Sequence, residues 1–128
     1  MIPGKVPHHP SFKRSFLFAL QGFYTTCKQE RNIKVMLVLG AFGACVAAFS
    51  HFDFLAWTIY CLCVGLVVSA ELFNTSIETV IDLVSPEFHP LAGKAKDISA
   101  AAVWFLCVCV SVVGVFLFLR AWGLLGCV

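Results

Sequence analysis

The sequence predicts an all-α integral membrane protein with three transmembrane helices and one N-terminal amphipathic surface helix. Hydrophobic residues make up 60% of the 128 positions and charged residues only 12%, and the mean hydropathy is +0.92, far from the composition of a soluble domain. Three apolar runs lack any Asp, Glu, Lys or Arg: residues 35–49, 54–70 and 98–119. A helix that crosses the hydrocarbon core needs about 20 such residues.

The N-terminal part of this single domain (1–128) is expected to contain a tail and the surface helix. Residues 1–10 are expected to form a flexible tail, because three prolines oppose regular structure there. Residues 11–31 follow the pattern of an amphipathic helix, which is expected to lie along the bilayer surface. Its apolar face contains Phe12, Phe16, Leu20, Phe23 and Cys27, and its polar face contains Lys13, Arg14, Gln21, Thr25 and Lys28.

Glu30 departs from this amphipathic pattern. It follows Phe12 by 18 residues, which is five helical turns and returns it to the apolar face. Periodicity alone leaves two interpretations open: a frayed helix end whose carboxylate reaches water, or a position with a specific role.

The membrane helices are predicted at 32–50, 53–84 and 97–120. The first reaches membrane length with help from Asn32, Ile33 and Lys34 at its start. The second is expected to continue beyond its apolar run, since residues 71–84 contain no Gly or Pro, and to end before Pro86. After a loop over residues 85–96, Asp97 is predicted to act as the N-cap of the third helix.

The distribution of positive charge predicts the orientation of these helices. Lys and Arg occur at positions 5, 13, 14, 28, 31, 34, 94, 96 and 120. Because positive residues concentrate on the cytoplasmic side, the N-terminus and the 84–97 loop are expected to be cytoplasmic, with a short outer turn near residues 50–53. Arg120 is the exception.

A polar stripe follows the second apolar run, in the segment "AELFNTSIETVIDLV". Glu71, Asn74, Glu78 and Asp82 are spaced by 3, 4 and 4 residues, which places them on one helix face. Carboxylates stacked in this way repel one another, and a divalent cation such as Mg²⁺ offsets the repulsion. The stripe therefore indicates a site for a metal and an anion, or a proton relay; a solvated helix end is the alternative.

A source of positive charge follows in "LAGKAKD". Lys94 and Lys96 precede the expected start of the third helix, where free backbone N–H groups suit phosphate oxygens. Asp97 could contact a sugar hydroxyl or a lysine, or act only as the N-cap. The sequence contains no P-loop, no protein-kinase Gly-rich loop and no G-x-S-x-G, so nucleotide chemistry here requires another kind of site.

"AELFNTSIETVIDLV", followed by "SPEFH" and "GKAKDISAAAV", resembles the signature of the small bacterial membrane lipid kinases, the diacylglycerol kinase and undecaprenol kinase family. The resemblance covers roughly residues 11–120. It implies a homotrimer with composite active sites at the cytoplasmic face of the bacterial membrane. The implied reaction is ATP- and Mg²⁺-dependent phosphorylation of a lipid alcohol, undecaprenol or diacylglycerol, and no nucleic acid partner is expected.

Carried over position by position, the resemblance implies individual roles. Glu71 resembles the general base, and with Ser99 it is expected at the lipid substrate. Glu30 and Glu78 are expected to bind Mg²⁺, and Asn74 and Asp82 to support the stripe. The nucleotide-binding positions implied are Phe18, Glu30, Glu78, Glu87, His89, Lys96 and Asp97.

Two positions depart from the family pattern. Phe18 stands where some relatives have a nucleotide-contacting tyrosine, and Ser11 where some have an arginine near the lipid. The segment "QERNIKVM" is more similar to the undecaprenol kinase branch.

Two other classes of protein remain as alternatives. A small oligomeric transporter would need a carboxylate deep in a membrane helix, and the apolar runs contain none. A non-enzymatic membrane subunit would give no reason for an acidic stripe on one face.

Overall fold

The computed structural model describes residues 11–124, which form four helices: α1 (Phe12–Gln29), α2 (Arg31–Phe49), α3 (Phe54–Val84) and α4 (Pro90–Ala121). The expected tail at 1–10 lies outside the described residues. Helices α2, α3 and α4 are each long and apolar enough to cross a membrane. These helices confirm the all-α class with three candidate spans and one additional N-terminal helix.

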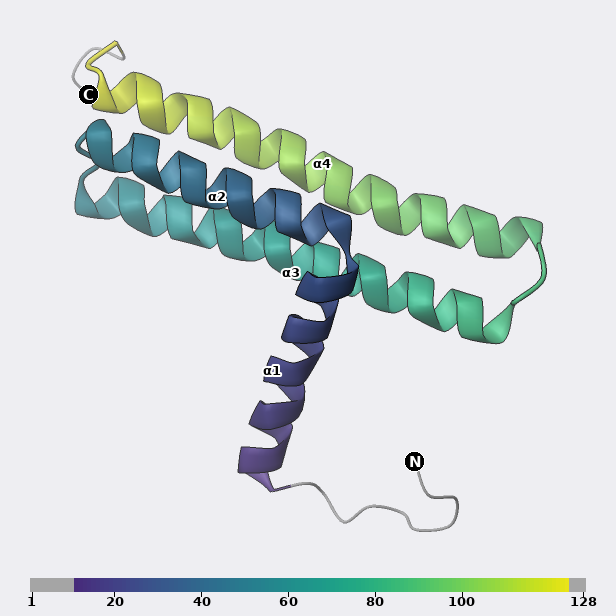
Figure 1. Ribbon diagram of the computed structural model, residues 1–128. Coiled ribbons are helices and arrows are strands. Elements are labelled where there is room, and N and C mark those ends of the chain that lie inside the picture. The colour runs from purple at the N-terminus through teal and green to yellow at the C-terminus, as the bar shows by residue number, and fades with distance from the viewer. Residues whose placement is uncertain (1–10, 125–128) are drawn as a thin grey trace.

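Helices α2, α3 and α4 lie side by side, and α1 leaves this bundle at the start of α2 (Figure 1). A short turn joins α2 to α3, and in it His51 adopts the left-handed conformation (φ 52°). Helix α3 is 12 residues longer than α2, with 31 residues against 19. The last part of α3, from Phe73 to Val84, therefore extends beyond α2 together with the first part of α4.

These lengths can be compared with the thickness of a bilayer. At about 1.5 Å per residue, α2 is about 28 Å long and α3 about 46 Å, whereas the hydrocarbon core is about 30 Å thick. If α2 spans the core, the α3–α4 hairpin extends about 18 Å beyond it. We call this segment, residues 73–96, the hairpin extension.

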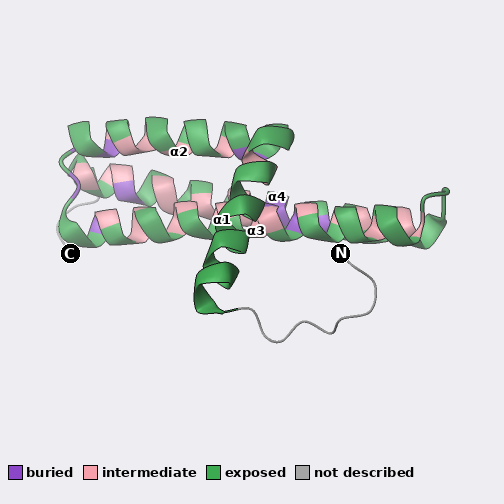
Figure 2. Cartoon of the chain, turned by 60° about the horizontal axis from the view of Figure 1, so that its bottom comes forward, coloured by how far each residue is buried: buried purple, intermediate pink, exposed green. Residues whose placement is uncertain are grey.

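Helix α1 has an apolar face that nothing in the chain covers. None of its residues is buried, and Figure 2 shows the helix almost entirely as exposed. Phe12, Phe16 and Leu20, predicted to share the apolar face, are 88%, 58% and 51% exposed. This exposure is what a helix lying on a bilayer surface requires.

The junction between α1 and α2 corrects the interpretation of Glu30. Helix α1 ends at Gln29, and Glu30 has an extended backbone (φ −87°, ψ 129°) that serves as the C-cap of α1 and the N-cap of α2. Extending the helical periodicity through Glu30 was therefore wrong, because the chain bends there. The ammonium group of Lys34 donates to the Lys28 carbonyl at 2.8 Å, which links the last turn of α1 to α2.

The start of α4 also differs from the prediction. The helix begins at Pro90, so the loop is residues 85–89 and Asp97 lies inside the helix, not at its N-cap. Proline suits the first helical position because its missing N–H would be unpaired there in any case. The N-cap is His89, whose Nδ1 accepts from the Leu91 N–H at 3.2 Å. Lys94 and Lys96 therefore have no free helix-end N–H groups beside them.

The opposite end of the bundle holds the main hydrophobic cluster of the chain. Ala47, Phe52, Ala56 and Leu117 are buried there, and they join the α2–α3 turn to the end of α4. Asp53 caps α3 by accepting from the Ala56 N–H at 2.7 Å, and its other oxygen pairs with Arg120 at 2.7 Å. The one basic residue predicted on the outer side is thus paired with a carboxylate.

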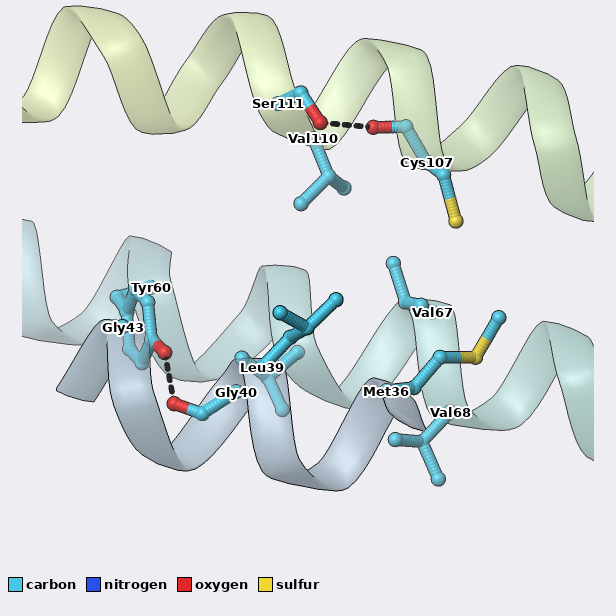
Figure 3. Close-up of a pocket in the computed structure, with 11 residues that line it drawn as sticks. Met36, Leu39, Gly40, Gly43, Tyr60, Val67, Val68, Cys107, Val110 and Ser111 are labelled. Carbon is cyan, nitrogen blue, oxygen red and sulfur yellow. Dashed lines mark hydrogen bonds between the residues drawn. The ribbon is translucent and has the colours of Figure 1, made fainter. Parts of the chain in front are cut away.

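An apolar pocket of about 300 Å³ lies between α2, α3 and α4 (Figure 3). Its two polar side chains are engaged within the chain: the Tyr60 hydroxyl donates to the Gly40 carbonyl, and the Ser111 hydroxyl donates to the Cys107 carbonyl at 2.7 Å. Neither hydroxyl proton is therefore left for a ligand. Gly40 and Gly43 let Tyr60 approach the backbone of α2.

Replacing Gly43 by alanine is expected to destabilise the protein by about 1–3 kcal/mol. A Cβ at this position would lie 2.6 Å from the Tyr60 Oη, so the hydrogen bond to Gly40 would be displaced. The usual effect of Gly→Ala inside a helix has the opposite sign, a gain of about 1 kcal/mol. The measurement is the thermal unfolding midpoint in detergent, with Gly114→Ala as control, because a Cβ there meets nothing within 4 Å.

The same clash can be tested by removing the atom that causes it. In a Tyr60→Phe background, Gly43→Ala is expected to lower the midpoint much less than it does alone. Equal losses in both backgrounds, or a rise on Gly43→Ala alone, would contradict the packing described.

Candidate active site

The polar stripe predicted from the sequence is present on α3, and its burial falls steadily along the helix. Glu71 is 3% exposed and Asn74 is 6% exposed, whereas Glu78 is half-buried and Asp82 is exposed. Glu71 lies near the level at which α2 begins, and the other three residues lie in the hairpin extension. The stripe therefore runs from a buried position at the edge of the candidate spans out to solvent.

Glu71 is a buried carboxylate without a basic partner in the described part of the chain. The two salt bridges found between residues 11 and 124 use the carboxylates of Asp82 and Asp53. Removing a carboxylate from water without a compensating charge is costly, so such residues near a membrane commonly have a functional role.

Two residues of the stripe bond to α4. The Lys96 ammonium group lies 2.5 Å from Asp82 Oδ1, and the Ser99 hydroxyl donates to Asn74 Oδ1 at 2.6 Å. The stripe therefore faces α4 at these two points. Asn74 also donates from Nδ2 to Glu78 Oε1 at 3.1 Å.

The hairpin extension contains a polar cavity of about 210 Å³ at its tip. Four of the predicted site residues line it: Asp82, Glu87, His89 and Lys96. The Ser85 hydroxyl donates to the Glu87 carbonyl at 3.1 Å and so helps to fix the loop. The cavity brings an ammonium group to a surface where phosphate oxygens could bind.

The carboxylates predicted as metal ligands are on separate elements. Glu30 is half-buried at the α1–α2 junction, and Glu78 is half-buried on α3. Within residues 11–124, no group of three or more His, Cys, Asp and Glu side chains is arranged to hold a metal. This donor set suits Mg²⁺, which is commonly held by one or two carboxylates together with substrate phosphates and water.

The other predicted site residues lie at the surface of the chain. Phe18 is 60% exposed on α1, Asp97 is exposed on α4, and Glu87 and His89 are exposed in the loop. No residue close to Phe18 is among those that line the cavity at the hairpin tip. The single chain therefore brings together part of the predicted nucleotide set and leaves Phe18 apart from it.

Sequence reasoning missed the links between α3 and α4. Lys96 pairs with Asp82, 14 residues away, and Ser99 bonds to Asn74, 25 residues away. The available signal was the serine itself, because a polar residue in the apolar stretch "DISAAAV" must find a hydrogen-bond partner when it is buried.

The fold and the site together define a multi-pass membrane protein with a polar site at one end of its helix bundle. The family model described as prokaryotic diacylglycerol kinase matches residues 17–118. The chain is 36% identical to the undecaprenol kinase of Bacillus subtilis (strain 168) over 112 residues, which covers 84% of this chain and 88% of that protein. It is 32% identical to a diacylglycerol kinase of Helicobacter pylori (strain ATCC 700392 / 26695) over 120 residues, 91% and 88% of the two chains. A second Helicobacter pylori diacylglycerol kinase (strain J99 / ATCC 700824) is 35% identical over 99 residues, 75% and 77% of the chains.

The chain belongs to the prokaryotic diacylglycerol kinase family. It is therefore a lipid kinase, a phosphotransferase that uses ATP and has an alcohol group as acceptor. The family resemblance seen in the sequence is confirmed, and the transporter and the non-enzymatic subunit are set aside.

Proposed function

We propose that this protein is an Mg²⁺-dependent kinase that transfers the γ-phosphoryl group of ATP to undecaprenol, with diacylglycerol as the alternative acceptor. The observation that carries the proposal is the position of Glu71. Its buried carboxylate lies near the start of α2, at the edge of the candidate spans, and the polar cavity lies further out in the hairpin extension. A membrane lipid and a water-soluble nucleotide have to meet at such a boundary.

In the proposed mechanism, Glu71 takes the proton from the lipid hydroxyl as that oxygen attacks the γ-phosphorus in line. Its burial without a basic partner keeps a proton acceptor where water is scarce. Lys96 is proposed to approach the phosphoryl oxygens, with Glu87, His89 and Asp97 as further nucleotide contacts. Phe18 is proposed as a nucleotide contact from α1.

Glu30 and Glu78 are the residues proposed to hold Mg²⁺. When bound, the ion supplies positive charge that offsets the charge on the phosphate oxygens. Glu78 already accepts one hydrogen bond, from Asn74, and an ionised carboxylate retains several other lone pairs. Asp82 is proposed to support the site by holding Lys96 near the cavity.

We further propose that the active form is a homotrimer, in which each site combines residues of two chains. Most large apolar side chains of α2, α3 and α4 are exposed in the single chain, and three thin helices do not enclose both a nucleotide and a lipid. Phe18 and Glu30, which belong to elements outside the cavity at the hairpin tip, are candidates for a contribution to a neighbour's site.

The proposed orientation has the hairpin extension in the cytoplasm of a bacterial cell. The basic residues of α1, of the start of α2 and of the first part of α4 lie on one side, and Arg120 at the other end is paired with Asp53. This distribution of charge supports the assignment under the positive-inside rule.

The test is phosphate transfer from labelled ATP to lipid by the purified protein, with undecaprenol and diacylglycerol compared side by side. Labelled undecaprenyl phosphate formed at the higher rate, and only with Mg²⁺ present, is the expected result. A higher rate with diacylglycerol would select the alternative acceptor. Equal rates without a divalent cation would contradict the role of Mg²⁺.

A further inference from the structure

Three buried or half-buried side chains are linked in a row between α4 and α3. The Ser99 Oγ donates to Asn74 Oδ1 at 2.6 Å, and Asn74 Nδ2 donates to Glu78 Oε1 at 3.1 Å. Ser99 is 8% exposed and Asn74 is 6% exposed. The amide of Asn74 thus connects a serine on one helix to a carboxylate on the other.

The charge of Glu78 decides the direction of these hydrogen bonds. An ionised carboxylate only accepts hydrogen bonds, so the NH₂ side of the Asn74 amide must face it. The amide oxygen then faces Ser99, and only a donor satisfies that oxygen. Ser99 has one hydroxyl proton and a second acceptor within reach, the Lys96 carbonyl at 2.9 Å, but the amide oxygen is the nearer of the two.

We propose that Ser99 is a positioning residue, which fixes the Asn74 amide and through it the carboxylate of Glu78. This inference rests on the proposed role of Glu78 as a ligand of Mg²⁺. It replaces the expectation that Ser99 contacts the lipid, because the hydroxyl proton of Ser99 is engaged with Asn74.

The physical reason is that Glu78 is a flexible side chain at a half-buried position. A carboxylate that is free to rotate loses conformational entropy when it binds an ion, and a fixed N–H donor removes part of that cost. The bond to Oε1 leaves Oε2 free to bind the ion. Removing the partner that orients a metal-binding side chain typically weakens metal binding roughly 10- to 100-fold.

The test compares the Mg²⁺ requirement with the lipid requirement in Ser99→Ala. We expect the Mg²⁺ concentration for half-maximal rate to rise about 10-fold, with the KM for lipid unchanged. Ser99→Thr, which keeps the hydroxyl, is expected to restore a requirement near wild type. Ser111→Ala is the matched control, because that serine lies on the same helix and donates only to its own Cys107 carbonyl.

A second comparison keeps the inference testable if Ser99→Ala folds poorly. In Asn74→Ala, Ser99 retains the Lys96 carbonyl as an acceptor, and the Mg²⁺ requirement is expected to rise by a similar factor. Adding Ser99→Ala to that variant is then expected to cause no further rise, because Ser99 acts through Asn74.

The outcomes separate this inference from the function on which it rests. A raised KM for lipid with an unchanged Mg²⁺ requirement in Ser99→Ala would overturn the inference in favour of a lipid contact, and no change in either would overturn it as well. Glu78→Gln tests the function itself: if that variant keeps the wild-type Mg²⁺ requirement, the role of Glu78 fails before that of Ser99.

Discussion

Replacing Glu71 by glutamine is expected to reduce phosphate transfer by about 10²-fold or more, the usual contribution of a general base. Glutamine has nearly the same shape, but its amide does not accept the proton of the lipid hydroxyl. Binding of ATP is expected to stay close to wild type, because Glu71 lies away from the cavity at the tip of the hairpin extension. The measurements are the rate of labelled lipid formation and the anisotropy of a fluorescent ATP analogue.

The same substitution is also expected to leave the thermal unfolding midpoint unchanged or to raise it. Glu71 is 3% exposed, and no Lys or Arg pairs with it among the described residues. Glutamine removes the cost of burying that charge. Loss of activity without loss of stability is the pattern expected of a residue retained for chemistry.

Asp53→Asn provides a matched control for Glu71→Gln. It exchanges a carboxylate for an amide at the opposite end of the bundle, where asparagine is an equally good N-cap for α3. Transfer by this variant is expected to remain near wild type. If Glu71→Gln lost nucleotide binding and transfer equally, Glu71 would have to be reassigned to the metal or to the fold.

The parts of the fold that the sequence predicted well depend on local chemistry. Three uncharged runs predicted three spans, and the absence of Gly and Pro between Glu71 and Val84 predicted that α3 continues beyond its apolar run. The single-faced stripe followed from the 3, 4 and 4 spacing, since helix geometry fixes which residues share a face. These statements need no knowledge of neighbouring helices.

The errors occurred where local rules give ambiguous signals. Pro90 and Gly93 suggested a loop, yet proline is favourable at the first helical position, and a glycine inside a helix costs only about 1 kcal/mol. Packing of α4 against α3 offsets such a cost. The N-cap of α4 is a histidine, which is not among the preferred capping residues, so capping patterns selected Asp97 instead.

The site itself was predictable as a set of residues but not as a set of contacts. Neither the Lys96–Asp82 pair nor the Ser99–Asn74 bond can be read from spacing, because both depend on the register of α3 against α4. Glu30 shows the converse error. Its face on a continuous helix was easily calculated, but the chain bends at that residue.

Replacing Lys96 by methionine is expected to reduce turnover by about 10²-fold or more, as the loss of a donor to transition-state charge commonly does. Methionine has a similar length but carries no charge, so the phosphoryl oxygens would lose the ammonium group. The unfolding midpoint is expected to change little, because the side chains of Lys96 and Asp82 are 35% and 66% exposed, and ion pairs at such positions contribute about 1 kcal/mol or less.

The comparison with Asp82→Asn decides between two roles for the lysine. If Lys96 acts on phosphate, releasing it from Asp82 leaves its charge in the cavity, and turnover is expected to fall far less than in Lys96→Met. If Lys96 serves only to pair with Asp82, both variants break the same bond and should behave alike. Turnover and the KM for ATP, measured for each single variant and for the double variant, distinguish these cases. Equal losses in the two single variants would remove Lys96 from the phosphate site and leave it as a link between α3 and α4.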